Sequence, residues 1–463
     1  MARAICGKIP AGGATYNREE SYRGSGLSEP KRGKLSVRRE RAFLVGVISP
    51  HEKRTAESCL SELSALARTA RARIVGELVQ HMRRPHPRTF LGSGKAAELR
   101  DLATSTEADV IICDSDLSPA QIRNLEKLTD TKVVDRSELI LDIFATHART
   151  KQARLQVELA QLEYTYPRLT RMWTHLSRYE GGIGTRGPGE TQLETDRRLV
   201  MRRITDLKRE LRVIDRRRQR EVRSRGEHFK VGLVGYTNAG KSTLMNALTD
   251  AGVLVQDQLF ATLDTRTRRW ELNGRGEALL SDTVGFIRKL PHHLVESFKA
   301  TLEEATNADL LLHVVDVSRH NAIEQADAVV EVLEEIGCRD RRILHVFNKI
   351  DALDDGTALH ILSERFPDAV AISALKGDGL DELTEAVLRE LQREFAELAV
   401  TFPSSNGKLA AFLFEHGDVL SREDEDFVTR MRVRLHRRHL GRISEHEDVE
   451  VRTADGKDTT RET

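Results

Sequence analysis

The stretch "FKVGLVGYTNAGKSTLMNAL", which runs from Phe229 to Leu248, decides the fold of the central part of this 463-residue chain. An apolar run predicts a buried strand, the pattern G-x-x-x-x-G-K-S then begins at Gly235, and helical apolar spacing follows. This strand–loop–helix order is the setting in which the pattern forms a P-loop. The backbone N–H groups of such a loop wrap phosphates, Lys241 is placed to reach the terminal phosphates, and Ser242 offers a hydroxyl to Mg²⁺. The sequence therefore predicts a nucleotide site on a mostly parallel sheet flanked by helices.

Three shorter motifs follow in the order that a guanine-nucleotide site requires, each at the end of an apolar run. Asp282 is placed to hold Mg²⁺ through water, and Gly285 lets a backbone N–H approach the γ-phosphate. Asp351 is placed to accept from the two N–H groups of guanine, a donor pair that adenine lacks, and an unpaired buried carboxylate is costly. Together the motifs predict a GTPase. They are DTVG at Asp282–Gly285, NKID at Asn348–Asp351 and SAL at Ser373–Leu375.

The segment "FATLDTRTRRW" between the P-loop and DTVG is expected to sense the γ-phosphate. Thr262 is the predicted threonine ligand of Mg²⁺ in this segment, and Thr265 and Thr267 are the alternatives. The predicted catalytic residues are Lys241, Thr262 and Gly285. The predicted metal ligands are Ser242, Thr262 and, through water, Asp282. The predicted nucleotide contacts are Gly235, Tyr236, Thr237, Asn238, Ala239, Gly240, Lys241, Ser242, Phe260, Ala261, Thr262, Leu263, Asp264, Asp282, Thr283, Val284, Gly285, Asn348, Lys349, Ile350, Asp351, Ser373, Ala374 and Leu375.

The residue after DTVG cannot supply one function that the predicted reaction requires, which is to orient the attacking water. Many GTPases carry a glutamine there that orients the attacking water, whereas this chain has Phe286, which cannot make that hydrogen bond. We therefore expect slow intrinsic turnover, with help from elsewhere in the chain or from a partner. Asn238 indicates one source, because in several GTPases an asparagine at this place helps bind K⁺ beside the phosphates. A local hydrogen bond of the asparagine is the alternative.

The rest of the chain divides into segments of different character. Residues 41–147 alternate between apolar runs and amphipathic helices, which predicts a parallel sheet with flanking helices. Residues 148–228 carry two heptad seams joined by a glycine-rich loop, and Pro167 is expected to bend or end the first helix. The predicted parts are a disordered basic leader (1–40), an α/β domain (41–147), a helical hairpin arm (148–228), a GTPase domain (229–397), a small α+β module (398–442) and a disordered tail (443–463).

The second helix of the arm is strongly basic, although the whole chain is nearly neutral with 73 basic and 72 acidic residues. From Asp196 to Arg225 there are 13 basic and five acidic residues, and such a stripe attracts phosphate backbones through counterion release. The loop end of the arm interleaves aromatic and basic residues, a mixture suited to RNA. The loop "GGIGTRGPGE" is then either an RNA-contacting loop or a structural turn. The predicted RNA contacts are Arg171, Trp173, Arg178, Tyr179 and Arg186.

Several of these stretches together resemble the HflX family of GTPases over about residues 41–440. The most specific is RGPGE-x-x-LE-x-DRR in the arm, supported by GYTNAGKST, FATLD, DTVGFI, NKID and SAL. The resemblance implies an N-terminal α/β domain, a helical hairpin, a GTPase domain and a small C-terminal domain. It also implies a protein that binds the large ribosomal subunit and ribosomal RNA, hydrolyses GTP, and splits stalled or idle ribosomes. A GTP-dependent docking switch without remodelling activity is the alternative.

The resemblance also raises the question of a second nucleotide site, because the family's N-terminal domain has been proposed to bind ATP. Gly92–Lys95 reads "GSGK" and opens a predicted helix, but it lacks the P-loop spacing, so a structural turn or an RNA-phosphate contact is the other interpretation. The four cysteines form no CxxC pair, and no apolar run approaches the ~20 residues that cross a bilayer. We expect a monomeric cytoplasmic protein with at most peripheral membrane association.

Overall fold

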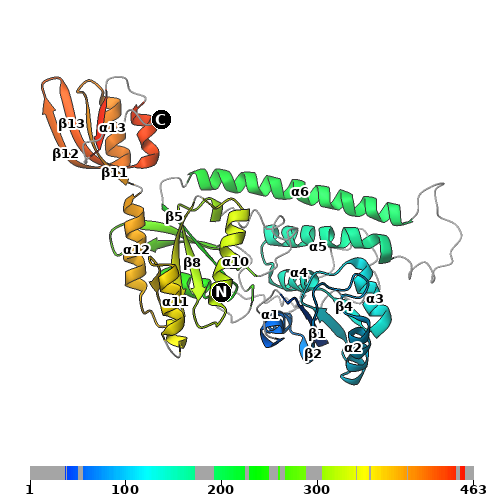
Figure 1. Cartoon of the computed structure of the whole chain (residues 1–463). Helices are drawn as coiled ribbons and strands as arrows, with labels where there is room; N and C mark the ends of the chain where they lie inside the picture. The colour runs from blue at the N-terminus through cyan, green and yellow to red at the C-terminus, as the bar shows by residue number, and fades with distance from the viewer. Residues whose placement is uncertain are drawn as a thin grey trace, which may run out of the picture.

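In the part of the chain that the computed structural model describes, three sheets are joined by helices and a long helical arm (Figure 1). Most of the predicted disordered leader lies outside the described residues. No helix within the described part of the chain is long and apolar enough to span a membrane. The described residues are 37, 39–50, 56–172, 192–224, 229–249, 259–260, 266–287, 305–339, 341–353, 356–393, 395–444 and 449–453.

The N-terminal domain alternates strands and helices in the order β1 (Arg41–Ile48), α1 (Ala56–Thr69), β2 (Arg73–His81), α2 (Ser93–Ser105), β3 (Val110–Cys113), α3 (Pro119–Thr129), β4 (Lys132–Val134) and α4 (Arg136–His147). The strands form a parallel sheet in the order β2-β1-β3-β4. The central strands are apolar because helices cover both faces, α1 and α4 on one side and α2 and α3 on the other. Helix α3 begins at a capping box between Ser118 and Gln121.

The arm consists of α5 (Lys151–Met172) and α6 (Gln192–Ser224). The two helices pack through an apolar seam, and their predicted heptad positions supply it. Of the two alternatives expected at Pro167, an end of the first helix is wrong, since α5 continues to Met172, and a bend at this residue stays a prediction. A proline removes one backbone hydrogen bond, and the seam contacts of Leu162 and Tyr166 on the preceding turns stabilise the helix across that loss.

The GTPase domain has the elements β5 (Phe229–Gly235), α7 (Lys241–Thr249), β6 (Arg266–Glu271), β7 (Glu277–Asp282), β8 (Leu310–Asp316), α10 (Ala322–Glu335), β9 (Arg342–Asn348), a 3₁₀ turn (Ile350–Ala352), α11 (Thr357–Arg365), β10 (Val370–Ala371) and α12 (Leu380–Arg393). Its sheet has the order β10-β9-β8-β5-β7-β6, and β6 is the antiparallel edge strand. The carboxyl ends of the parallel strands meet at one edge, which is where ligands bind in sheets of this kind. The predicted motifs therefore converge there.

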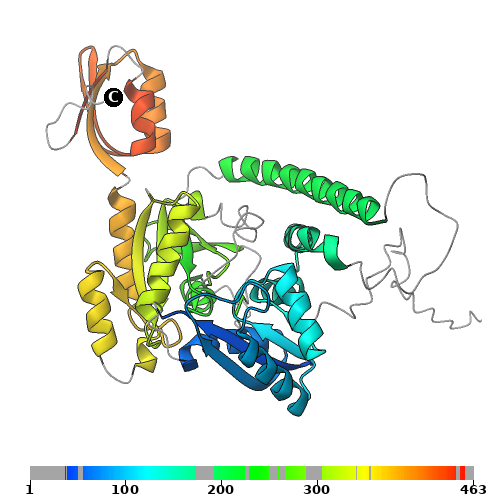
Figure 2. The ribbon, with the colours of Figure 1, turned by 45° about the vertical axis from the view of Figure 1, so that its right-hand side comes forward.

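The C-terminal domain contains β11 (Phe395–Pro403), α13 (Gly407–His416), β12 (Gly417–Glu425), β13 (Val428–His436), a 3₁₀ turn (Arg437–His439), α14 (Leu440–Ser444) and β14 (Glu450–Thr453). Its antiparallel sheet has the order β12-β13-β11-β14. The module therefore extends beyond the predicted 398–442, and a disordered tail from residue 443 is wrong for β14, whose Val451 is buried. Figures 1 and 2 show this domain beyond the end of α12, away from the N-terminal domain.

Candidate functional site

The P-loop joins the end of β5 to the start of α7 at the carboxyl edge of the GTPase sheet. Two of its glycines are required by space as well as by backbone angle. Gly235 has a φ of +151°, and a Cβ there would overlap the carbonyl oxygen of Val314 on β8. Gly240 has a φ of +92°, and a Cβ there would overlap the side-chain amide of Asn348 on β9. The neighbouring strands therefore fix the shape of the loop.

The first turn of α7 brings the predicted phosphate and metal ligands together. Lys241 is buried, and its Nζ donates hydrogen bonds to the carbonyl oxygens of Gly235 (3.1 Å) and Tyr236 (2.8 Å). Burial lowers the pKa of this amine to about 8, while the Asp282 carboxylate acts in the opposite direction. Ser242 Oγ donates to Asp282 Oδ2 at 2.7 Å. The oxygens of these two predicted metal ligands lie side by side, and such a donor set fits Mg²⁺.

The DTVG motif and the residue after it close onto the P-loop through the backbone. The hydroxyl of Thr283 donates to the carbonyl oxygen of Leu233 at 2.6 Å and fixes the end of β7. Phe286 N donates to Gly235 O at 3.0 Å, and Phe286 O accepts from Thr237 N at 2.8 Å. The ring of Phe286 is only 2% exposed and lies in an apolar cluster. The side chain that replaces the usual glutamine is therefore part of a core.

The NKID and SAL motifs are joined to the P-loop by side-chain hydrogen bonds. Asn348 Nδ2 donates to Ala239 O at 2.8 Å, and Asn348 Oδ1 accepts from Ala374 N at 3.0 Å. Ser373 Oγ donates to Asp351 Oδ1 at 2.6 Å and so holds the carboxylate predicted to select guanine. These hydrogen bonds hold the NKID and SAL motifs beside the P-loop.

Asp316, at the end of β8, is a site residue that sequence reasoning missed. It is buried, and its Oδ2 accepts from Lys349 Nζ at 2.7 Å. The same Nζ donates to Asn238 O at 2.9 Å, and Asn238 has a positive φ of 64°. The signal that identifies it is an aspartate directly after the apolar run "LLLHVV", at the same edge as the other motifs. Asp316 therefore orients the lysine of NKID against the P-loop.

The structure describes some of the remaining predicted site residues and not others. Thr267, one of the alternative threonines, lies on β6, where its Oγ1 is 3.0 Å from Ser281 Oγ on β7. Phe260 is buried, Ile350 starts the 3₁₀ turn, and Leu375 is 79% exposed. Arg171 lies in the last turn of α5, where the structure describes its backbone alone. Outside the described residues are Ala261, Thr262, Leu263, Asp264, Thr265, Trp173, Arg178, Tyr179 and Arg186.

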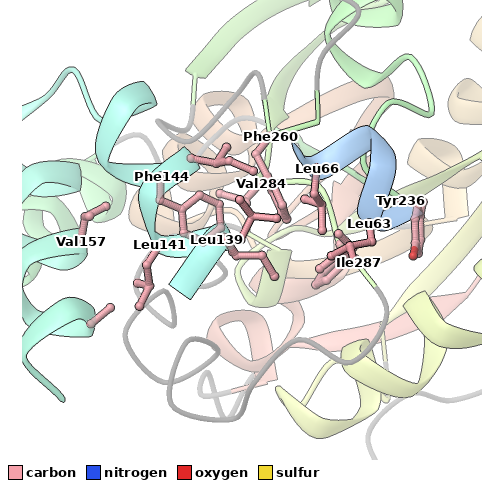
Figure 3. Close-up of a cluster of buried hydrophobic side chains, with 14 of the residues drawn as sticks. Leu63, Leu66, Leu139, Leu141, Phe144, Val157, Tyr236, Phe260, Val284 and Ile287 are labelled. Atoms are coloured by element: carbon pink, nitrogen blue, oxygen red, sulfur yellow. The ribbon is translucent and has the colours of Figure 1, made fainter. Parts of the chain in front are cut away.

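An apolar cluster joins the nucleotide-site loops to the N-terminal domain (Figure 3). The ring of Phe260 meets the ring of Phe144 edge to face, with centroids 4.7 Å apart. Sequence reasoning did not predict this cluster, because its members lie far apart in the chain. The cluster includes, among others, Tyr236, Phe260, Val284, Phe286 and Ile287 from the GTPase domain and Leu63, Leu66, Leu139 and Phe144 from the N-terminal domain.

A buried polar contact lies beside this cluster. The hydroxyl of Tyr236 donates to Glu62 Oε1 on α1 at 2.7 Å. Arg136, at the start of α4, donates to the same oxygen at 2.8 Å and to Asp114 Oδ1 at 2.6 Å. Arg136 is 2% exposed, so its charge depends on these two carboxylates. The P-loop is thereby connected to the carboxyl edge of the N-terminal sheet.

The "GSGK" segment opens α2 as a short turn. Gly92 is the residue before the helix, and its N–H donates to Gln80 Oε1 at 3.0 Å. Lys95 Nζ pairs with Glu98 at 2.8 Å on the same helix. The side chains of Gln80 and Glu98 therefore bond the N–H of Gly92 and the amine of Lys95.

Models of known protein families match most of the chain. Four family descriptions match successive parts of the chain: "GTP-binding GTPase N-terminal" (57–145), "GTP-binding GTPase Middle Region" (147–225), "50S ribosome-binding GTPase" (230–349) and "HflX C-terminal domain" (358–456).

Individual relatives cover nearly the same range. GTPase HflX of Lacrimispora saccharolytica is 48% identical over 84% of this chain and 91% of its own length. GTPase HflX of Escherichia coli is 45% identical over 81% of this chain and 88% of its own length. A solved GTP-binding protein from Sulfolobus solfataricus, in complex with GDP, is 26% identical over 76% of this chain and 99% of that chain, with a TM-score of 0.40. The identity and coverage of the two relatives show that the chain belongs to the HflX family of GTPases.

Proposed function

We propose that this protein binds the large ribosomal subunit and the whole ribosome, hydrolyses GTP there, and uses the nucleotide cycle to split stalled or idle ribosomes. It acts as a monomer, its intrinsic turnover is slow, and the large subunit stimulates it. The observation that carries the proposal is the contact between the loops of the nucleotide site and the domain that carries the basic arm. Packed side chains therefore connect the γ-phosphate end of the nucleotide site with the arm that is proposed to bind RNA.

The arm supports the RNA part of the proposal. Arg202, Arg209, Arg212 and Arg216 are exposed on α6, and their spacing places them on one helical face. That face is opposite the apolar seam, which includes Leu207. No ion pair involves these four arginines among the described residues, so their charges are available to phosphates.

A second contact supports the coupling between nucleotide and arm. Arg168 on α5 donates to Asp135 Oδ2 at 3.2 Å, and its guanidinium lies 3.5 Å from the ring centroid of Tyr164. Asp135 caps the start of α4, directly before Arg136. The arm and the polar contact of Tyr236 thus meet on the same helix start. Movement of the P-loop side would therefore reach α5 near the loop end of the arm, where Arg168 lies.

Magnesium is part of the proposed reaction. Ser242 and Asp282 would hold it, with Thr262 as the third predicted ligand. When bound, the ion neutralises charge on the β- and γ-phosphates. The chain's own contribution is to keep the two oxygens adjacent at the end of β7.

Potassium is a further proposed cofactor, with Asn238 as its ligand. The positive φ of Asn238 and the hydrogen bond from Lys349 Nζ to its carbonyl oxygen hold this residue at the surface of the P-loop. A K⁺ there would add positive charge beside the phosphates, where other GTPases use an arginine.

ATP binding by the N-terminal domain is a further part of the proposal. The short "GSGK" turn has its first N–H engaged by Gln80 and its lysine paired with Glu98. An ATP site there would need to displace both contacts. Equilibrium binding of ATP to a variant with Lys241→Met, compared with wild type, separates this site from the P-loop.

The deciding experiment measures GTP hydrolysis by the purified protein alone and with isolated large ribosomal subunits, followed by dissociation of whole ribosomes in a density gradient. Stimulation together with GTP-dependent dissociation is the expected result. Salt-sensitive binding and stimulation without dissociation would support the docking switch instead. Good GTP binding without stimulation would overturn the ribosomal assignment.

A further inference from the structure

A loop of the N-terminal domain, here called the basic loop (residues 82–90), carries positive charge on a short stretch of chain. It joins β2 to α2 and reads MRRPHPRTF, with three arginines and no acidic residue. The arginines are Arg83, Arg84 and Arg88, and all three are exposed. No ion pair involves them within the part of the chain that the structure describes. Their charges are therefore available to an anionic partner.

Hydrogen bonds from a neighbouring helix hold the backbone of the basic loop. Gln121 Nε2 on α3 donates to His86 O at 2.9 Å. Asn124 Nδ2, one turn further along α3, donates to Arg88 O at 2.9 Å. His86 and Phe90 also exchange two backbone hydrogen bonds of 2.9 Å each. The loop therefore presents its arginines from a fixed backbone.

The end of the basic loop is anchored in the core of the domain. Phe90 is 1% exposed and packs in an apolar cluster with Leu99. Its φ of +61° is unfavourable for a bulky residue, and such a conformation persists where the surroundings over-determine it, often at functional sites. Pro85 and Pro87 restrict the exposed part further, because each fixes its own φ. A segment held in this way loses little conformational entropy when it binds.

The composition of the basic loop fits a phosphate backbone. Guanidinium groups bind phosphate oxygens through paired hydrogen bonds. Recognition of unpaired bases relies on stacked aromatic rings, and the one phenylalanine of the loop is buried. A protein interface relies on apolar or aromatic anchors at its centre, whereas the exposed residues of this loop are arginines, prolines and a histidine. The chemistry therefore favours double-stranded RNA, which is recognised through its backbone and shape.

We propose that the basic loop is a second RNA contact of this protein, separate from the arm, and that it binds the phosphate backbone of double-stranded ribosomal RNA. The inference rests on the proposed function, because the large subunit supplies that RNA. Arg83, Arg84 and Arg88 neutralise phosphates and read no sequence, since contacts to the backbone position a protein and do not specify a base. With the arm, the loop gives the protein two separate points of attachment.

The test replaces Arg83, Arg84 and Arg88 together by alanine in the full-length protein. Arg100→Ala is the matched control, because Arg100 lies on α2 of the same domain and is paired with Asp101 at 2.9 Å. Affinities for isolated large subunits and for an RNA duplex of about 16 base pairs, the length that RNA-shape readers span, are measured at several salt concentrations. GTP hydrolysis without RNA is the check that each variant folds.

We expect the triple variant to lose about three from the slope of log affinity against log salt, one for each phosphate no longer neutralised. At about 0.1 M salt its affinity for both probes should fall by about 10-fold or more, and Arg100→Ala should stay near wild type. An unchanged slope in the triple variant overturns the proposal. Binding of wild type to polyglutamate as tightly as to the duplex would assign the loop to an acidic polypeptide instead. If the triple variant does not fold, each single variant should lose about one from the slope.

The two proposals fail in different ways. Large subunits that neither bind wild type nor stimulate its GTP hydrolysis would refute the proposed function. A duplex affinity that still depends on the three arginines would then leave the RNA contact of the basic loop in place. Normal stimulation by large subunits together with unchanged slopes in the triple variant would refute the basic loop alone.

Discussion

The hydroxyl of Tyr236 on the P-loop donates a 2.7 Å hydrogen bond to Glu62 on helix α1 of the N-terminal domain. The same oxygen of Glu62 also accepts from Arg136 at 2.8 Å. A loop that binds phosphate is thus tied to a residue 174 positions away in sequence, in a domain that carries none of the four nucleotide motifs.

Tyr236→Phe removes this tie while leaving Glu62 paired with Arg136. We expect the free energy of local opening of α1 to fall by about 1 kcal/mol, the net worth of one hydrogen bond. Hydrogen exchange of the α1 amides should then be about fivefold faster, by the same free-energy scale. Tyr166→Phe, which removes a hydroxyl from the arm, is the control and should leave α1 unchanged. Unchanged exchange in Tyr236→Phe would mean that the hydrogen bond does not hold the two domains together.

Phe286→Ala tests the interdomain cluster. Truncating a buried phenylalanine costs about 3–5 kcal/mol of stability. We therefore expect a lower unfolding midpoint in urea but continued GTP hydrolysis, because the ring takes no part in orienting water. Complete loss of hydrolysis with normal GTP binding would contradict this assignment.

The lowered pKa of Lys241 predicts a pH dependence of stability in the nucleotide-free protein. Between pH 8 and 10.5 the unfolded chain keeps a proton on this amine that the folded chain has released. Unfolding then takes up a proton, so this group makes the folded state more stable as pH rises through that window, by up to about 3 kcal/mol. The measurement is the difference between wild type and Lys241→Met in urea unfolding at several pH values. A difference that does not change with pH would place the amine in a more polar environment than its burial indicates.

The four exposed arginines on one face of α6 (Arg202, Arg209, Arg212 and Arg216), here called the arginine stripe, predict a salt-dependent affinity for the large subunit. Replacing Arg209 or Arg212 by alanine should weaken binding. It should also reduce the slope of log affinity against log salt by about one for each phosphate that the arginine neutralises. Arg203→Ala is a matched control, because Arg203 is held by Glu158 at 2.7 Å. Equal slopes for all three variants would remove the stripe from the proposed interface.

The proposed K⁺ is tested by comparing hydrolysis in KCl and NaCl at equal ionic strength. We expect a higher rate in KCl, and we expect Asn238→Ala to reduce that difference. Equal rates of wild type in the two salts would exclude the ion from the mechanism.

The parts of this fold that sequence predicts are those set by local order. The P-loop is recognisable because Gly235, Gly240 and Lys241 keep a fixed spacing between a strand and a helix, and the strands of the N-terminal domain show as apolar runs. The parts that sequence does not predict depend on partners far along the chain. Phe286 stands where a glutamine is expected, and only its burial in the interdomain cluster shows it as a core residue.

The same dependence on residues far along the chain explains the other differences between the sequence predictions and the structure. Pro167 is a local signal for a helix end, yet contacts with α6 outweigh it. The strand β14 has only four residues and follows polar sequence, so its pairing with β11 decides its structure. Asp316 has no motif of its own and gains its role from Lys349, which directly follows the neighbouring strand β9.

The length of α6 has a mechanical consequence. Its 33 residues make a rod of about 50 Å at 1.5 Å per residue. If its base turned by about 5° with the nucleotide state, the far end would sweep about 4 Å, from that same length. A small rotation at one end of this helix would then become a displacement of its other end that is longer than a hydrogen bond.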